Sequence, residues 1–190
     1  MNEEREDAHP LHVGAHADLK RVIGHIEAQT GLRTRWDGSL QVRDLVFRFS
    51  GQKHRSCGIS IREDVLSVPA YRWSTMIHEG LHSVSGGFSG VGPPPDPWEE
   101  AIVEQSQRIL RPAILIAIGI EIADDDLAAR DEAHPYNPGI RRLEIVREVL
   151  RRDLRDFYLA LLASSAYERT RIRIDAQRHL QSDGGVESWA

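Results

Sequence analysis

The sequence predicts an α+β protein, and two features of its hydrophobic pattern support that prediction. Between positions 40 and 68, apolar residues alternate with polar ones, as they do in strands of a half-buried sheet. One segment before position 30 and most of the chain after position 70 instead repeat apolar residues at helical spacing. An order of one helix, a small sheet and then a run of helices is typical of the α+β class.

Length and composition indicate a single domain. A chain of 190 residues is long enough for one ordinary hydrophobic core and short for two. Apolar residues make up 41% and charged residues 28%, the balance of a globular domain. Because no repeat or low-complexity linker divides the chain, we expect one domain over residues 1–190, with residues 1–12 and 183–190 disordered.

Charge and cysteine content exclude several classes of protein. A net charge of -5 provides no basic field for nucleic acid or an anionic membrane. The longest apolar stretch, Ala113–Ile122, is too short to cross a bilayer, and the acidic start is unlike a secretory signal. We therefore expect a cytoplasmic protein that binds neither nucleic acid nor membrane. Cys57 is the only cysteine, which excludes an internal disulfide and cysteine-rich zinc sites.

The first half of the chain predicts a helix and two strand regions. Ala15–Gln29 has apolar residues at helical spacing and is followed by Gly31, a plausible helix stop. After a turn signal at Asp37-Gly38, the alternation over residues 40–49 predicts a strand, and Cys57–Val68 predicts a second strand region.

The second half predicts helices separated by loops. A helix over Tyr71–Ser85 should end at the two glycines that follow it, and the Gly- and Pro-rich segment Phe88–Pro97 should be a loop. A helix from Trp98 to Leu110 should be interrupted by Pro112. The remaining expected elements are a buried helix over Ala113–Ile122, a short helix capped by Asp124–Asp126, a loop over Ala133–Gly139, one long or two joined helices over Ile140–Ala166, and a last helix over Glu168–His179.

The strongest chemical signal is an H-E-x-x-H pattern at His78, Glu79 and His82. Two histidines four residues apart lie on one helix face, where both imidazoles can reach a single ion. Glu79 would lie near the open side of that ion and could accept a proton from water. Apolar neighbours would bury this helix, and buried polar groups need a partner, which a metal ion supplies. The motif therefore predicts a metal site rather than two solvated histidines.

A catalytic zinc site needs a third protein ligand and an open fourth position. Glutamates 99, 100 and 104 lie on the next predicted helix, after a loop long enough to reverse the chain. Glu100 has Glu104 one turn later, whereas Glu99 has Val103 there. Because a ligating histidine usually donates its other N–H to a polar partner, we assign Glu100 to the metal and Glu104 to the orientation of His78. Glu99 remains the alternative ligand.

The pattern from His78 to Glu104 resembles that of the gluzincin metallopeptidases, and the similarity covers about residues 57–108. The resemblance implies a zincin-like fold, one Zn²⁺ held by His78, His82 and Glu100, Glu79 as general base, and Glu104 supporting a histidine. It also implies that the strand region Cys57–Val68 is an edge strand that holds an extended substrate. No third histidine stands at the metzincin spacing, where Ser85 and Phe88 are found.

Gluzincins commonly stabilise the oxyanion with a Tyr or His from a later segment. The resemblance therefore points to Tyr136 or His134 in the loop Ala133–Gly139, with Tyr136 preferred and Tyr71 a weaker alternative. The leading interpretation is a zinc-dependent endopeptidase that acts on a peptide or protein substrate. The alternatives are a catalytically silent binding module with the same fold and a zinc hydrolase acting on a non-peptide amide. The sequence does not predict an oligomeric state.

Overall fold

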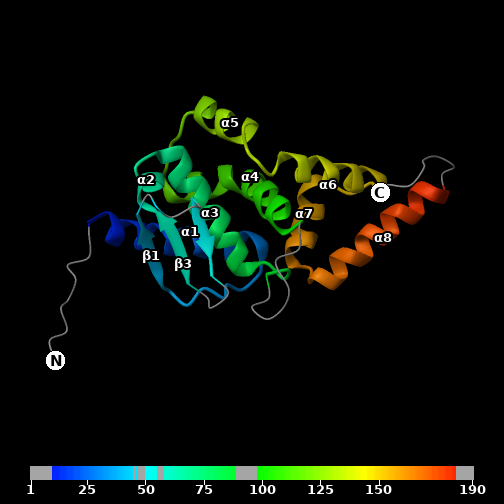
Figure 1. The fold of residues 1–190 in the computed structure, drawn as a ribbon, viewed down its shortest axis with the longest axis horizontal. Helices are drawn as coiled ribbons and strands as arrows, with labels where there is room; N and C mark the ends of the chain where they lie inside the picture. Colours follow the sequence, from blue (N-terminus) through cyan, green and yellow to red (C-terminus); the bar gives the residue numbers. More distant parts are fainter. Residues whose placement is uncertain (1–9, 45, 47–49, 55–57, 89–97, 183–190) are drawn as a thin grey trace.

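The computed structural model describes residues 10–44, 46, 50–54, 58–88 and 98–182. In this part of the chain the fold is α+β, with eight helices and one small mixed sheet, as the sequence predicts. Figure 1 shows the sheet at one end of an elongated molecule and the C-terminal helices at the other. The elements in chain order are α1 (Pro10–Thr30), β1 (Leu40–Arg43), β2 (Gly51–Lys53), β3 (Ile59–Arg62), α2 (Glu63–Leu66), α3 (Pro69–Val84), α4 (Glu99–Ile118), α5 (Asp124–Glu132), α6 (Asn137–Val149), α7 (Leu154–Ala163) and α8 (Ala166–Ser182).

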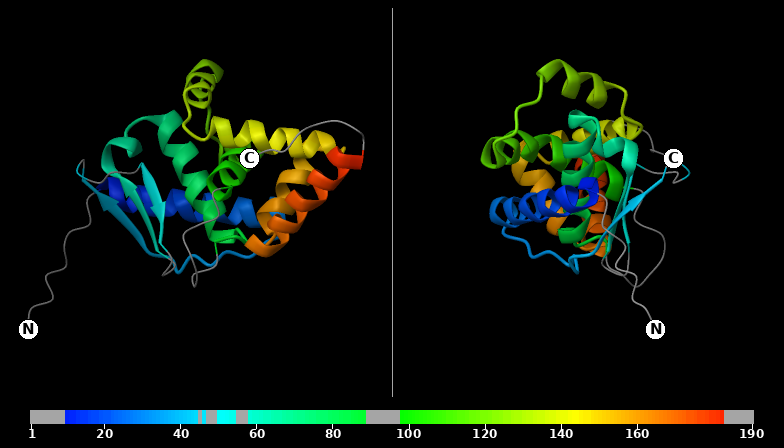
Figure 2. Two further views of the ribbon diagram at one scale, coloured as in Figure 1. Left: turned by 45° about the vertical axis from the view of Figure 1, so that its right-hand side comes forward. Right: turned by 90° about the vertical axis from the view of Figure 1, so that its left-hand side faces the viewer.

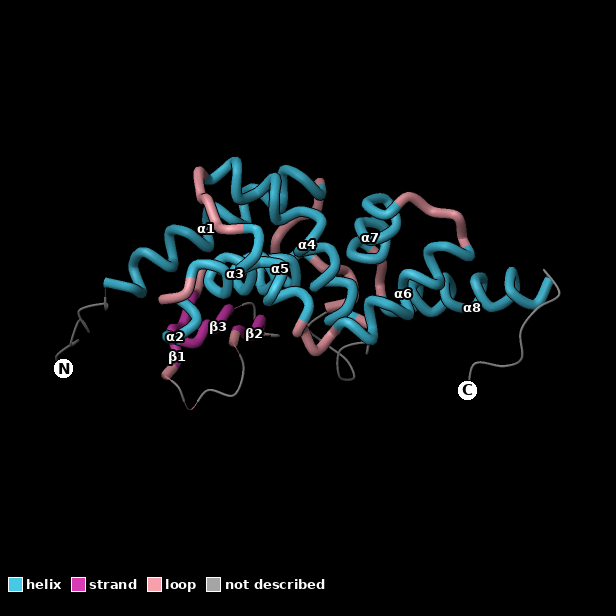
Figure 3. The backbone as a smooth tube through the Cα atoms, turned by 90° about the horizontal axis from the view of Figure 1, so that it is seen from above, coloured by secondary structure: helices cyan, strands magenta, loops and turns pink. Residues whose placement is uncertain are grey.

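Helix α3 is the central element of the fold. It packs against α1, α4 and β2, and in Figure 3 it lies between α1 and the layer of the sheet. Pro69 occupies the first turn, where its missing N–H costs nothing, and the helix ends before Gly86 and Gly87. Nearly every residue of α3 from Trp73 onward is buried, so the metal motif lies inside the protein.

Gly80 explains how α1 approaches α3 so closely. A Cβ at position 80 would lie 2.7 Å from Cδ1 of Ile26, so a larger residue there would force the side chain of Ile26 to shift. Helix α1 begins at Pro10, which makes residues 10–12 helical instead of disordered. The other residues expected to be disordered, 1–9 and 183–190, lie outside the described part of the chain, as do Cys57 and most of the Phe88–Pro97 loop.

The sheet differs from the prediction in the extent of its strands and in the position of β3. The strand order is β1-β3-β2, with β1 parallel and β2 antiparallel to β3. The expected strand region Cys57–Val68 is wrong beyond Arg62, because Glu63–Leu66 form the short helix α2 that leads the chain into α3. Two acidic residues in the first turn of α2 favour helix there. Strand β3 is also central rather than an edge strand, and the edge that faces α3 is β2.

Helix α4 continues through Pro112, so the predicted interruption there is wrong. Pro112 removes one donor and leaves the carbonyl of Arg108 without its helical partner, at a cost of about 3 kcal/mol. Because Pro112 lies on the exposed face, water can hydrate that carbonyl, while Leu110, Ile114 and Leu115 bury the opposite face. The expected helix Ala113–Ile122 is thus the end of α4, which stops at Gly119 with a left-handed φ of 73°.

The C-terminal half consists of α6, α7 and α8, seen beyond α4 in both views of Figure 2, with α5 at the edge of the molecule. The segment Ile140–Ala166 forms two helices, one of the two predicted arrangements. The break contains Arg151 with a φ of 51°, and Asp153 caps α7 by accepting from the backbone N of Asp156 at 3.1 Å. No helix in the described ranges is long and apolar enough to cross a membrane.

Candidate metal centre

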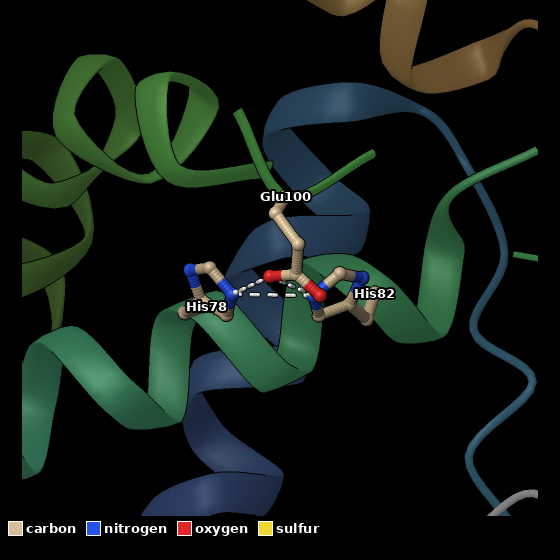
Figure 4. Close-up of side chains that lie close together, drawn as sticks. All are labelled: His78, His82 and Glu100. Carbon is tan, nitrogen blue, oxygen red and sulfur yellow. Dashed lines mark hydrogen bonds and ion pairs between the residues drawn. The ribbon is translucent and has the colours of Figure 1, made fainter. Parts of the chain in front are cut away.

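Three side chains from α3 and α4 converge at the centre of the molecule. In Figure 4 the imidazoles of His78 and His82 and the carboxylate of Glu100 point toward one another. The Nε2 atoms of the two histidines are 3.2 Å apart, and Oε2 of Glu100 is 3.1 Å from that of His78 and 3.4 Å from that of His82. These three residues form the group that could hold a metal ion in the described chain.

The separations match the spacing of ligands around one tetrahedral ion. Two donors that each lie about 2.0–2.1 Å from a zinc ion at tetrahedral angles are about 3.3 Å apart. The three observed separations lie within about 0.2 Å of that value. Two imidazole nitrogens and one carboxylate oxygen are also a donor set that zinc accepts in catalytic sites. The residues present therefore fit a divalent ion with one coordination position left open.

Each imidazole is held from behind by a buried glutamate. Nδ1 of His78 lies 3.1 Å from Oε2 of Glu104, whose other oxygen accepts from Arg130 at 2.9 Å and Arg108 at 3.1 Å. A carboxylate has no proton to donate, so Nδ1 of His78 carries the hydrogen and Nε2 faces Glu100. The structure thus places Glu104 where the sequence predicted it, against His78.

Glu99 supports the second histidine instead of replacing Glu100. Its Oε1 lies 3.0 Å from Nδ1 of His82, while its Oε2 accepts from Arg169 of α8 and from Ser85 at 3.0 Å. The sequence alone suggests Glu99 only as an alternative ligand. The signal that could have found its role is that two ligating histidines need two Nδ1 partners, and adjacent glutamates are available for them.

The buried carboxylates of the site shift the pKa values of the two histidines. Burial lowers the pKa of His78 and His82, but hydrogen bonds to Glu100, Glu104 and Glu99 outweigh it and raise these pKa values to about 9 and about 10. Burial raises the pKa of Glu99, and the opposing pull of His82 and Arg169 lowers it to about 2. In the metal-free protein, the glutamates therefore favour protonation of the imidazoles, and a divalent ion would compete with those protons.

Glu79 lies in the wall of the site, next to the ligands and close to β2. It is buried, and burial raises the pKa of its carboxyl group, while the neighbouring imidazoles oppose that rise. Its carboxylate accepts a hydrogen bond from the backbone N–H of Lys53. A Cβ on Gly51 would lie 2.8 Å from both Cγ and Oε1 of Glu79, so β2 passes directly over this side chain.

Tyr136 and His134 both reach the site from the loop before α6. The ring of Tyr136 stacks on His78 with centroids 6.0 Å apart, and its hydroxyl donates to Glu100. Burial, followed by the charge of Glu100, raises the pKa of Tyr136 above its ordinary value. Nε2 of His134 lies 3.5 Å from Glu104, and burial lowers its pKa to about 4. Tyr136 is therefore the nearer of the two to the ligands, and His134 lies beside Glu104.

Two hollows meet at the site. One, of about 350 Å³, includes Tyr71, Thr75, Arg130 and His134 in its lining. The other, of about 440 Å³, includes Gln52, Lys53, His54 and Phe88. Both are lined by four shared residues, Gly51, His78, Glu79 and Tyr136. Two adjoining hollows therefore border the site along β2.

Comparison of the chain with models of protein families, with curated proteins and with solved structures gives no match.

Proposed function

We propose that this chain is a zinc-dependent peptidase of the gluzincin kind, and that it cleaves within peptide chains. The observation that carries the proposal is the convergence of His78, His82 and Glu100, with Glu79 buried beside them and not used as a ligand. The resemblance of the motif to gluzincins and the α+β fold agree with this proposal, which extends to a zincin-like fold.

The arrangement beside the ligands favours zinc hydrolysis over oxidation. Two histidines and one carboxylate also bind iron(II) in oxygenases. A hydrolytic zinc site in addition needs a carboxylate placed to accept the proton of the attacking water, and Glu79 meets that need. A carboxyl group with a raised pKa is a better proton acceptor than an exposed one, which suits Glu79 to this role.

Each residue of the site has a separate role in the proposed reaction. When bound, zinc would polarise the scissile carbonyl and acidify the attacking water. Glu79 takes the water proton and passes it to the nitrogen of the leaving amine, so the C–N bond breaks as that nitrogen becomes neutral. The Tyr136 hydroxyl turns from Glu100 to the developing oxyanion, which it stabilises by donating a hydrogen bond. Glu104 and Glu99 keep both imidazoles in the tautomer that leaves Nε2 free.

Strand β2 is the element that can hold an extended substrate. The backbone N of Arg62 donates to Ser50, and that of His54 donates to Gly58, so residues 50, 52 and 54 direct their polar groups toward β3. The backbone groups of Gly51 and Lys53 therefore point away from the sheet. The N–H of Lys53 is used by Glu79, and we propose that a substrate chain pairs with the backbone of Gly51.

The shape of the site favours a peptide over a compact amide. One hollow is lined by the start of β2 and the other by the whole strand, and because they share the residues around Glu79 a chain could occupy both at once. A small amide would need only one of them. The intact Glu79 also argues against a silent binding module, which has no use for a buried carboxylate next to a metal.

The test compares Glu79→Gln with the native protein. Glutamine keeps the shape of the side chain but does not accept the water proton, so zinc content should stay unchanged while cleavage of unfolded protein substrates is lost. Glu132→Gln, on the exposed surface of α5, is the matched control and should cleave normally. Equal cleavage by Glu79→Gln and the native chain would contradict the proposed mechanism.

A further inference from the structure

We propose that Arg169 of α8 is a positioning residue for the metal centre, acting on His82 through Glu99. This inference rests on the metal site of the proposed function but not on peptide cleavage. Arg169 ion-pairs with Oε2 of Glu99, whose Oε1 accepts from Nδ1 of His82. The chain of contacts thus runs from the C-terminal helix to a ligand on α3.

The contacts of Arg169 are those of a fixed side chain. It is 1% exposed, and Glu99 is fully buried. Its Nε donates to the carbonyl of Leu161 at 2.9 Å, and its Nη2 lies 3.0 Å from Oγ of Ser85, which in turn donates to Glu99. A planar guanidinium with three anchored nitrogens holds the carboxylate in one orientation. The orientation of Glu99 then fixes the ring of His82.

Gly87 provides an independent sign that this pair is closely fitted. A Cβ at position 87 would lie 2.1 Å from Nη1 of Arg169 and 2.7 Å from Oε2 of Glu99. The backbone therefore passes against the ion pair, and only glycine leaves room for it. Gly87, which the sequence suggested only as part of a helix stop, therefore also leaves space for this ion pair.

The two histidines are supported by separate arginines, which makes the inference testable. Arg130 of α5 acts on His78 through Glu104, and Arg108 shares that carboxylate. Among the described residues, the cationic partners of Glu99 are Arg169 and His82. Loss of Arg169 should thus affect His82, whereas loss of Arg130 should affect His78.

The experiment measures zinc binding and the imidazole N–H signals of ¹⁵N-labelled, zinc-loaded protein. Arg169→Met should weaken zinc binding about ten- to a hundred-fold, the usual effect of removing a group that supports a ligand. The Nδ1–H signal of His82 should shift or broaden while that of His78 stays in place. Arg130→Met is the matched control. In that variant the Nδ1–H signal of His78 should shift or broaden while that of His82 stays in place. Arg169→Lys, which keeps the charge, should restore part of the affinity.

Methionine at position 169 leaves a buried carboxylate unpaired and could prevent folding. In that case zinc binding is measured on the double variant Glu99→Gln with Arg169→Met, which removes both charges of the ion pair. It should fold and bind zinc more weakly than the native protein. Native affinity in either variant, or equal shifts of both histidine signals in Arg169→Met, would overturn the inference. A lack of Glu79-dependent cleavage would contradict only the peptidase, because the zinc and N–H measurements are made without substrate.

Discussion

Gly51→Ala tests whether β2 sets the position of Glu79. The new Cβ would lie 2.7 Å from Cγ2 of Thr75 and 2.8 Å from both Cγ and Oε1 of Glu79, whereas ordinary contacts begin at 3.4 Å. Either the carboxylate or the strand must move by about 0.6 Å, the difference between 3.4 and 2.8 Å. Since a displacement of about 1 Å can cost about a hundred-fold in rate, we expect kcat to fall by about ten- to a hundred-fold. That loss corresponds to about 1.4–2.7 kcal/mol of activation free energy.

The assay follows cleavage of an unfolded protein substrate together with zinc affinity. Zinc affinity should not change in Gly51→Ala, because neither Gly51 nor Glu79 is a proposed ligand. The extra methyl group should reduce the free energy of unfolding by about 1–3 kcal/mol, so a denaturation curve must show that the variant is folded at the assay temperature.

Gly24→Ala is the matched control for this substitution. Gly24 lies in α1, and a Cβ there meets no atom within 4 Å. The change should raise the free energy of unfolding by about 0.5–1 kcal/mol and leave kcat unaltered. A folded Gly51→Ala protein with native kcat would refute the argument that the close approach of β2 positions the carboxylate.

Three further predictions concern the same site. Tyr136→Phe should lower kcat by about 10²–10³-fold, because it removes the proposed oxyanion donor, and should change zinc affinity less, because it removes one hydrogen bond to Glu100 but no ligand; a native rate would exclude Tyr136 from that role. Zinc affinity should rise from pH 6 to about pH 9, since the metal-free protein holds protons on His78 and His82, with pKa values of about 9 and about 10, that binding must displace. Calorimetry in buffers of different ionisation enthalpy measures this proton release, and an affinity independent of pH would contradict it. At free zinc 100 times the Kd, the loaded protein should be more stable to unfolding by about 2.7 kcal/mol than the chelator-treated protein, and identical thermal unfolding would exclude a ligand of the native state.

The motif helix and the ligand cluster were predictable because they depend on short-range rules. Residues four apart on a helix share a face whatever surrounds them, so His78 and His82 had to lie together once α3 formed. The assignment of Glu100 followed from the same spacing applied to Glu104. In each case the prediction depended only on residues within one or two turns of the same helix.

The sheet and the support of His82 depend on contacts between distant parts of the chain. Strand β2 has only three residues, too few to show an alternating pattern, and its pairing makes β3 central rather than an edge. Arg169 stands 70 residues after Glu99, and no spacing rule connects them. Helix α4 continues through Pro112 because burial of the opposite face outweighs the lost hydrogen bond, a balance that depends on tertiary packing.

The central claim is tested most directly by metal analysis of the native chain and of Glu100→Ala. Each protein is purified without added zinc and is then equilibrated with a small excess of zinc. We expect about one zinc ion for each native chain and little in the variant, because two histidines alone leave the ion without its third protein ligand. A native protein that retains no zinc, or a Glu100→Ala variant that retains as much as the native protein, would contradict the proposed metal centre.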